Sequence, residues 1–198
     1  MIPMILASSS SIRAQLLRQV GLDPEIRPAR IDETAILDSL RAEEASPRDI
    51  ADTLAEMKAR KIAEKGEPGL VLGCDQVLEH KGTPFQKAQN QNEAHAQLMM
   101  LQGSTHRLLS AAVLYDEGKP VWRTVGQVRL TMRPMSAIQV DRYLDRNWAR
   151  VADAVGCYKL EEEGARLFSR VDGDYFTVLG LPLLDLVSYL VLRGDMEP

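Results

Sequence analysis

The chain has 198 residues, of which 45% are hydrophobic and 26% are charged, as is ordinary for a soluble globular protein. This length is enough for a sizeable core, so we expect a single domain over residues 1–198, or two lobes that share a cleft. The formal net charge of −4 argues against general affinity for nucleic-acid polymers, which normally bind basic surfaces. A small anionic ligand is compatible with this charge if its site is locally basic.

Several other classes of protein lack support. Cys74 and Cys157 are far apart and form no CxxC spacing, so they predict neither a disulfide framework nor a zinc site. The three histidines also lack the spacing of metal ligands. No basic segment of a signal peptide precedes the first apolar run, and no stretch approaches roughly 18 uninterrupted apolar residues. We therefore expect a cytoplasmic protein without a membrane partner.

The first segment combines a strand, a serine run and a helix. A short strand is predicted over Ile2–Ala7, and a helix from about Ile12 to Val20 follows the four serines Ser8–Ser11. A strand that turns directly into a helix leaves unpaired N–H groups and the positive end of the helix dipole at the turn, which favours an anion. Serine hydroxyls and the guanidinium of Arg13 would add donors for phosphate oxygens. Alternatively, one serine only caps the helix and the others shape the turn.

The middle of the chain supplies a second candidate site. A polar stretch containing Ile31–Thr34 leads to a helix predicted from Pro47 to about Glu64, with Ser46 as its cap. The apolar run Leu70–Cys74 predicts a buried strand, with Asp75 at its C-terminal end. Ligands of open α/β sheets bind at such strand ends.

Helices and strands continue to alternate in the second half. The pattern predicts helices over Asn92–Leu101, over Ser136–Trp148 and after Pro182 to about Arg193. It predicts strands over Arg107–Tyr115, Val121–Met132 and Gly156–Leu160. This order predicts an α/β fold, with a mixed twisted sheet flanked by helices.

Asp75 is the sharpest chemical candidate, because a carboxylate at a strand end can accept a proton from water or hold a metal ion. It could also simply cap the turn after the strand. A phosphatase with an aspartate nucleophile of the haloacid-dehalogenase type requires a second aspartate two residues later, where this chain has Val77. Lys58 and Lys87 are candidate phosphate ligands, although most lysines lie on solvated surfaces. The phosphate-loop, dinucleotide-binding and nucleophile-elbow motifs GxxxxGK[ST], GxGxxG and GxSxG are all absent from the sequence.

Taken together, the motifs resemble those of the Maf family of nucleoside triphosphate pyrophosphatases over almost the whole chain. The matching segments are Leu6–Arg13 (family pattern LASxSPRR), Ile31–Glu33, Leu54–Ala59 (LAxxKA), Gly73–Val77 (GxDTVV), Lys87, Leu101–His106 (LSGxxH), and Gly173–Tyr175 with Gly180–Pro182 (GDYxxVxGLP). Each segment alone is weakly specific, but their common order is a specific signal.

The resemblance implies a fold like that of Maf and ITP pyrophosphatases, with a ligand cleft between two lobes. It implies hydrolysis of a nucleoside triphosphate to a nucleoside monophosphate and pyrophosphate, in which Asp75 accepts the proton of water and Glu33 assists. Asp75 and Glu33 would also hold a divalent cation, Mg²⁺ or Mn²⁺. The implied substrate ligands are Ser8, Ser10, Arg13, Lys58 and Lys87, whereas Ser9 and Ser11 only shape the turn.

Departures from the family pattern bear on the substrate. The replaced positions are Ser11, Ile12, Gln76, Ala88 and Ala154, the last standing where the family has a lysine. Glu161 stands where the pyrimidine-preferring subgroup has glutamine. Ile12 and Glu161 together are more similar to the subgroup that favours 7-methylguanosine triphosphate, and a carboxylate suits the N–H donors of a guanine edge. We therefore expect Ile12, Gln76 and Glu161 to determine specificity for a modified nucleotide.

Two other functions stay open at this stage. The departures, Ala154 above all, are compatible with a nucleotide sensor that binds but no longer hydrolyses. An interaction protein, for example in cell-division control, is the second alternative. The resemblance also implies a homodimer among the partners.

Overall fold

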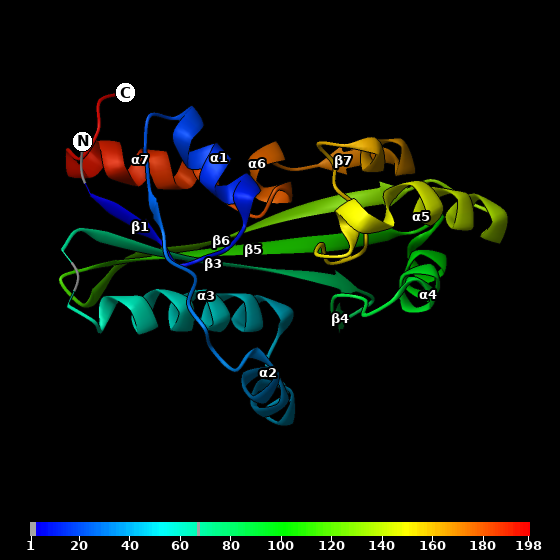
Figure 1. The fold of residues 1–198 in the computed structure, drawn as a ribbon, viewed down its shortest axis with the longest axis horizontal. Coiled ribbons are helices and arrows are strands. Elements are labelled where there is room, and N and C mark those ends of the chain that lie inside the picture. The colour runs from blue at the N-terminus through cyan, green and yellow to red at the C-terminus, as the bar shows by residue number, and fades with distance from the viewer. Residues whose placement is uncertain (1–2, 67) are drawn as a thin grey trace.

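The computed structural model describes residues 3–66 and 68–198. Within these ranges one seven-stranded sheet runs through the molecule in the order β2-β1-β3-β5-β6-β7, and β4 pairs with β3 outside this path. β1 is parallel to β2 and β3, and the other pairings are antiparallel. Helices cover both faces (Figure 1). This architecture confirms the predicted α/β fold with a mixed sheet and flanking helices.

The strands are β1 (Met4–Leu6), β2 (Glu25–Ile26), β3 (Leu70–His80), β4 (Thr83–Phe85), β5 (Thr105–Asp116), β6 (Lys119–Met132) and β7 (Phe168–Asp172). The helices are α1 (Ser11–Gln19), α2 (Glu33–Ala42), α3 (Pro47–Ala63), α4 (Gln91–Leu101), α5 (Ala137–Val151), the 3₁₀ helix η1 (Glu163–Leu167), α6 (Tyr175–Val178) and α7 (Leu183–Arg193). No helix in the described part of the chain is long and apolar enough to cross a bilayer.

One predicted strand is wrong. Residues 156–160 form turns and irregular backbone instead of a strand. The cause is local, because Gly156 and Cys157 both have positive φ, at 79° and 57°, which extended backbone does not allow. The polar stretch after the first helix contains β2 and α2, which were not predicted. Of the predicted first strand, Ile2 lies outside the described residues.

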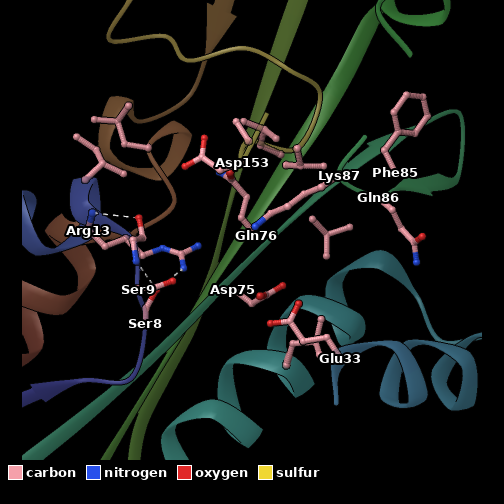
Figure 2. Close-up of a pocket in the computed structure, with 18 of the residues that line it drawn as sticks. Ser8, Ser9, Arg13, Glu33, Asp75, Gln76, Phe85, Gln86, Lys87 and Asp153 are labelled. Atoms are coloured by element: carbon pink, nitrogen blue, oxygen red, sulfur yellow. Dashed lines mark hydrogen bonds between the residues drawn. The ribbon is translucent and has the colours of Figure 1, made fainter. Parts of the chain in front are cut away.

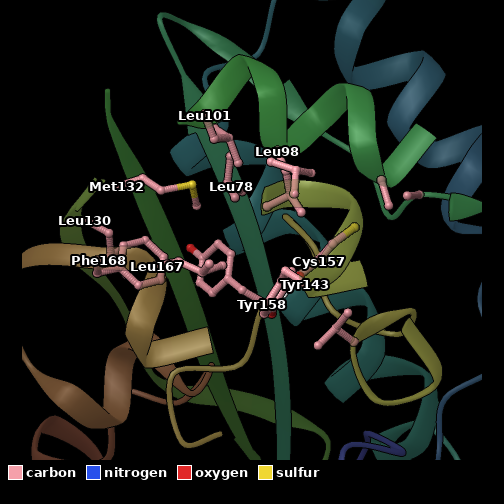
Figure 3. Packing of buried hydrophobic residues seen from close by; sticks show 14 of the residues in the cluster. Leu78, Leu98, Leu101, Leu130, Met132, Tyr143, Cys157, Tyr158, Leu167 and Phe168 are labelled. Carbon is pink, nitrogen blue, oxygen red and sulfur yellow. Dashed lines mark hydrogen bonds between the residues drawn. The ribbon is translucent and has the colours of Figure 1, made fainter. Parts of the chain in front are cut away.

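The sheet carries two lobes with separate cores. At one end α1 and α7 pack on one face and α3 packs on the other (Figure 1). At the far end α4 and α5 pack on the same face as α1 and α7, around buried residues such as Leu78, Leu98 and Tyr158 (Figure 3). β3, β5 and β6 contribute side chains to both ends and therefore join the two lobes.

β3 has an open edge at the junction of the lobes. On this edge β1 pairs with residues 70–72, and β4 pairs with residues 78–80. Residues 73–77 therefore have no strand beside them there, whereas β5 pairs with residues 71–79 on the opposite edge. This corrects the prediction that Asp75 ends its strand, because Asp75 lies in the middle of β3. The strand that ends near Asp75 is β1, the parallel neighbour of β3.

Gly73 allows α3 to lie directly on this part of β3. A Cβ at Gly73 would lie 2.1 Å from the carbonyl oxygen of Ala55 and 2.6 Å from the nitrogen of Ala59. Both distances are far inside van der Waals contact, so a side chain at this position would push the helix away. The close approach brings Lys58, on the same helix, to Asp75, two residues along the strand.

Candidate active site

A cavity of about 700 Å³ lies at the open edge of β3. Its wall combines the start of α1, parts of α2 and α3, the segment after β4 and residues 153–162 (Figure 2). All the site residues predicted from the sequence line it: Ser8, Ser10, Ile12, Arg13, Glu33, Lys58, Asp75, Gln76, Lys87 and Glu161. The volume is in the range of small-molecule sites in proteins.

Side chains from both faces of the sheet reach this cavity. Asp75 points to the face covered by α3, where it meets Lys58. Gln76, the next residue, points to the opposite face and contacts α6. Neighbouring residues of a strand point to opposite faces of the sheet. One pocket can therefore contain both side chains only where it extends around an open edge of the sheet.

The serine turn forms the N-terminal end of α1. Ser10 is the N-cap, and its hydroxyl accepts a hydrogen bond from the backbone nitrogen of Arg13 at 3.4 Å. The buried Ser8 hydroxyl accepts from the backbone nitrogen of Ser10 at 3.2 Å. Ser9 and Ser11 are exposed. A helix N-terminus that lines a cavity in this way offers partial positive charge to an anion.

Arg13 is held firmly from three sides. Its Nε donates to the carbonyl oxygen of Gly180 at 2.8 Å, and its Nη1 donates to Ser8 Oγ at 3.2 Å and to the carbonyl oxygen of Cys74 at 3.1 Å. The last contact uses a carbonyl group on the open edge of β3. These bonds fix the guanidinium plane and leave Nη2 without a hydrogen-bond acceptor among the described residues. An Nη2 group fixed in this way is ready to donate to a ligand.

Lys58 joins two carboxylates on the α3 face. Its Nζ lies 2.6 Å from Asp75 Oδ1 and 2.7 Å from Glu33 Oε1. The side chains of Lys58 and Asp75 are only 12% and 13% exposed, whereas that of Glu33 is 51% exposed. Each carboxylate uses one oxygen for the ammonium, so Asp75 Oδ2 and Glu33 Oε2 remain for other partners.

Burial changes how this pair ionises. Burial raises the pKa of Asp75 above its ordinary value, against the opposing attraction of Lys58 and Arg13. For Lys58, burial alone would lower the pKa, but the charges and hydrogen bonds of Asp75 and Glu33 outweigh it and raise the pKa. A carboxylate with a raised pKa that is adjacent to a permanent cation is a good candidate for a general base.

The three predicted specificity residues occupy different parts of the wall. Ile12 is half-buried in the first turn of α1, where it packs against the core on that face. Gln76 is half-buried, and its Nε2 donates to Ser110 Oγ and Val178 O, each at 2.9 Å. Glu161 is exposed on the far side, in the segment that links α5 to η1.

Two lysines extend the basic character of the wall on the far lobe. Lys87 is exposed after β4, and Figure 2 shows its side chain reaching toward Gln76. Lys159 was missed in the sequence; its Nζ lies 3.0 Å from Asp153 Oδ1 and it lines the pocket beside Ala154. It thus places an ammonium on the segment where the family lysine is replaced by Ala154. The sequence offered one indication of this role, because Lys159 stands two residues before Glu161, which was predicted to lie in the site.

Comparisons with known proteins point to one family. The family model described as Maf-like protein matches residues 3–192. A nucleoside triphosphate pyrophosphatase from Roseobacter denitrificans is 58% identical over 194 residues, which cover 98% of each chain. A 7-methyl-GTP pyrophosphatase from Mesorhizobium japonicum is 42% identical, over 98% of this chain and 97% of the relative.

A solved structure supports the fold alone. The structure of a HAM1 protein from Coxiella burnetii superimposes with a TM-score of 0.56 at 15% sequence identity, over 98% of this chain and 100% of that chain. The family match covers nearly the full length of the chain. The chain belongs to the Maf family.

Proposed function

We propose that this protein is a nucleoside triphosphate pyrophosphatase, which hydrolyses its substrate to a nucleoside monophosphate and pyrophosphate. The observation that carries the proposal is the pair of Asp75 and Lys58 in the pocket that also contains the serine turn. One pocket thus combines a candidate base with donors for phosphate oxygens. The names of the Roseobacter and Mesorhizobium relatives support the same reaction.

The phosphate chain would bind along the serine turn. Three kinds of group there can donate to phosphate oxygens: the backbone N–H groups at the start of α1, the Ser10 hydroxyl and Nη2 of Arg13. Lys87 would neutralise charge from the opposite wall. These contacts would hold the α phosphorus in a fixed position and reduce the repulsion that an approaching nucleophile meets.

Asp75 would act as the general base. Its Oδ1 is held by Lys58, so Oδ2 is the oxygen that can accept a proton from water. Water attacks the α phosphorus, the bond to the bridging oxygen breaks, and pyrophosphate leaves with the bond electrons. Lys58 keeps the carboxylate oriented and supplies positive charge near the reacting group.

A divalent cation fits the chemistry of these residues. Asp75 and Glu33 provide hard carboxylate oxygens, of which Oδ2 and Oε2 are not used by Lys58, and Mg²⁺ and Mn²⁺ prefer such ligands together with phosphate oxygens and water. When bound, the cation would neutralise phosphate charge. In the described part of the chain no three histidine, cysteine or acidic residues form a metal cluster, so the phosphates would have to complete the coordination.

We propose that the substrate is a modified purine nucleotide, of which 7-methylguanosine triphosphate is the leading candidate. Glu161 lines the pocket, and its exposed carboxylate can accept from the N–H groups of guanine. Methylation at N7 adds positive charge to the base, which a carboxylate also favours. Because such substrates arise in the nucleotide pool of the cell, we keep a cytoplasmic location as part of the proposal.

The direct experiment measures pyrophosphate release with Mg²⁺ or Mn²⁺ from 7-methylguanosine, guanosine, uridine and deoxythymidine triphosphates. We expect pyrophosphate to be released fastest from 7-methylguanosine triphosphate. A clear preference for the two pyrimidines would overturn the assignment of Glu161. Tight binding without release from any of them would favour the sensor instead.

A further inference from the structure

The motif Gly173–Pro182 supports two residues of the site, because Gly180 O holds Arg13 and the end of α6 contacts Gln76. It contains α6, a single helical turn that begins at the N-cap Asp174. The Asp174 carboxylate accepts from the backbone nitrogens of Phe176 at 3.3 Å and of Thr177 at 2.7 Å. The turn lies directly on the sheet because β6 has Gly126 there, where a Cβ would come within 2.8 Å of Thr177 Oγ1.

The carbonyl groups at the end of α6 point to two side chains of the sheet. Thr177 O accepts from Ser110 Oγ at 2.7 Å and from Gln76 Nε2 at 3.2 Å. Val178 O accepts from Gln76 Nε2 at 2.9 Å. Ser110 and Gln76 are register partners on β5 and β3, and Ser110 is fully buried.

These contacts determine the orientation of the Gln76 amide. The Ser110 hydroxyl uses its only hydrogen on Thr177 O, so it can only accept from Gln76. All three partners of Nε2 are therefore acceptors. Rotating the amide by half a turn would place its oxygen against two carbonyl oxygens and one hydroxyl lone pair, so Oε1 is the atom left for the pocket.

We propose that Ser110 is a positioning residue, which with the end of α6 holds Gln76 so that only its carbonyl oxygen meets the substrate. The pocket wall then presents two acceptors for a base, Gln76 Oε1 and the Glu161 carboxylate. A guanine-type edge carries two adjacent N–H donors and matches them. Uracil and thymine carry one N–H between two carbonyl groups, and those carbonyls would need donors that a fixed Gln76 cannot supply.

This inference rests on the proposed function, because it assumes that a nucleotide base lies beside Gln76. Its test is the ratio of the dissociation constants of GTP and UTP, measured by calorimetry, since binding requires no hydrolysis. The variants are Ser110→Ala, Gln76→Leu and the double substitution. Ser104→Ala is the matched control, because Ser104 Oγ also donates to a carbonyl oxygen at 2.7 Å, but its partners are Leu101 and His80 instead of Gln76 and α6.

We expect wild-type protein to prefer GTP, and Ser110→Ala to reduce this preference about three- to tenfold, the effect of losing one hydrogen bond that orients a group. Ser104→Ala should leave the ratio unchanged. If Ser110 acts through Gln76, the double variant should match Gln76→Leu alone. Additive effects, or equal losses for both nucleotides in Ser110→Ala, would overturn the inference.

The two proposals can fail separately. A protein that binds GTP selectively but releases no pyrophosphate contradicts the proposed function and leaves Ser110 to be judged by the binding ratio. A protein that releases pyrophosphate but keeps its wild-type ratio in Ser110→Ala contradicts the inference alone. Binding of neither nucleotide contradicts the inference, whereas the proposed function is then decided by pyrophosphate release from 7-methylguanosine triphosphate.

A second variant covers the case in which Ser110→Ala does not fold. Asp174→Ala loosens α6 from its other end, and Asp174 does not line the pocket. It should also reduce the GTP preference. In addition it should weaken binding of both nucleotides, because the same segment supplies Gly180 O, which fixes Arg13. An unchanged ratio in this folded variant would count against α6 as a positioning element.

Discussion

The two faces of β3 build the pocket by different means. On the α3 face Asp75, Lys58 and Glu33 form a compact charged group, two members of which are almost buried. On the opposite face Gln76 and Ser110 form neutral hydrogen bonds with the end of α6. A charged group of this kind is suited to stabilise charge that changes during a reaction, whereas neutral hydrogen bonds fix the direction of donors and acceptors.

This difference predicts different consequences of substitution. Changes on the charged face should lower turnover of every nucleotide, because all share the triphosphate. Changes on the neutral face should alter the choice among nucleotides and leave turnover of a good substrate closer to its normal value. The predictions below use this division and run from the largest expected effect to the smallest.

Asp75→Asn should have the largest effect. The amide keeps the size of the side chain but cannot accept a proton from water, so kcat should fall about 10³-fold, within the usual range for loss of a general base. Nucleotide binding, measured by calorimetry, should be largely retained. Turnover near the wild-type value would exclude Asp75 as the base.

Lys58→Met should lower kcat about 10²-fold for all nucleotides and destabilise the protein by about 3 kcal/mol, since it leaves the buried Asp75 without its cation. Denaturant unfolding measures the second effect. Lys58→Arg, which keeps the charge, should lose less kcat and less stability. Equal losses in the Met and Arg variants would show that the charge is unimportant.

The same variant should change the pH dependence of kcat/KM. A base must be ionised, so activity falls as the pH drops through the pKa of Asp75, and burial already raises this pKa. The Lys58 ammonium opposes that effect, so removing it raises the pKa further. The acid limb of the profile should therefore move to higher pH in Lys58→Met. A shift to lower pH would contradict this electrostatic account.

Arg13→Ala should lower kcat/KM about 30-fold through both a higher KM and a lower kcat, because one charge-assisted contact to phosphate is lost. The reduction should be similar for purine and pyrimidine nucleotides. A profile identical to wild type would place Arg13 outside the substrate site.

Gly73→Ala should act on the charged face from a distance. The new methyl group would clash with the backbone of α3 and move Lys58 away from Asp75. We expect about a tenfold lower kcat and a loss of stability of about 2 kcal/mol, as is typical for overpacking. Unfolding transitions and steady-state kinetics measure the two effects. Full activity in this variant would mean that α3 can shift without disturbing the pair.

Glu161→Gln should have the smallest effect on turnover and a clear effect on choice. The amide keeps one acceptor but loses the charge, so preference for 7-methylguanosine over uridine triphosphate should fall about threefold, with kcat nearly unchanged. The ratio of kcat/KM values measures it. A large drop in kcat for both substrates would show that Glu161 takes part in turnover and not only in the choice of nucleotide.

The residue types of the site were predictable, but part of the geometry was not. The serine run and Arg13 could be interpreted locally, because a helix start and its cap depend on neighbouring residues. Asp75 was identified correctly as a pocket residue but misplaced at a strand end. Its strand continues because β5 pairs along it, a long-range contact that an apolar run of five residues cannot indicate.

Elements stabilised by distant packing were missed. α2 has no buried residue, and its apolar residues stand among polar and charged ones in a stretch that was interpreted as polar, although its first turn carries Glu33. Residues 156–160 have an apolar pattern like a strand, but the positive φ angles of Gly156 and Cys157 exclude extended backbone there. Ser110 gave no signal, because a buried serine becomes informative only when its acceptor on α6 is known.

The central claim is that Asp75 directs water to the α phosphorus. Hydrolysis in water enriched in ¹⁸O tests it most directly, with the products separated and analysed by mass spectrometry. We predict that the label appears in the nucleoside monophosphate, that the other product is unlabelled pyrophosphate, and that Asp75→Asn forms both about 10³-fold more slowly. Label in pyrophosphate, or release of a nucleoside diphosphate with inorganic phosphate, would contradict the account.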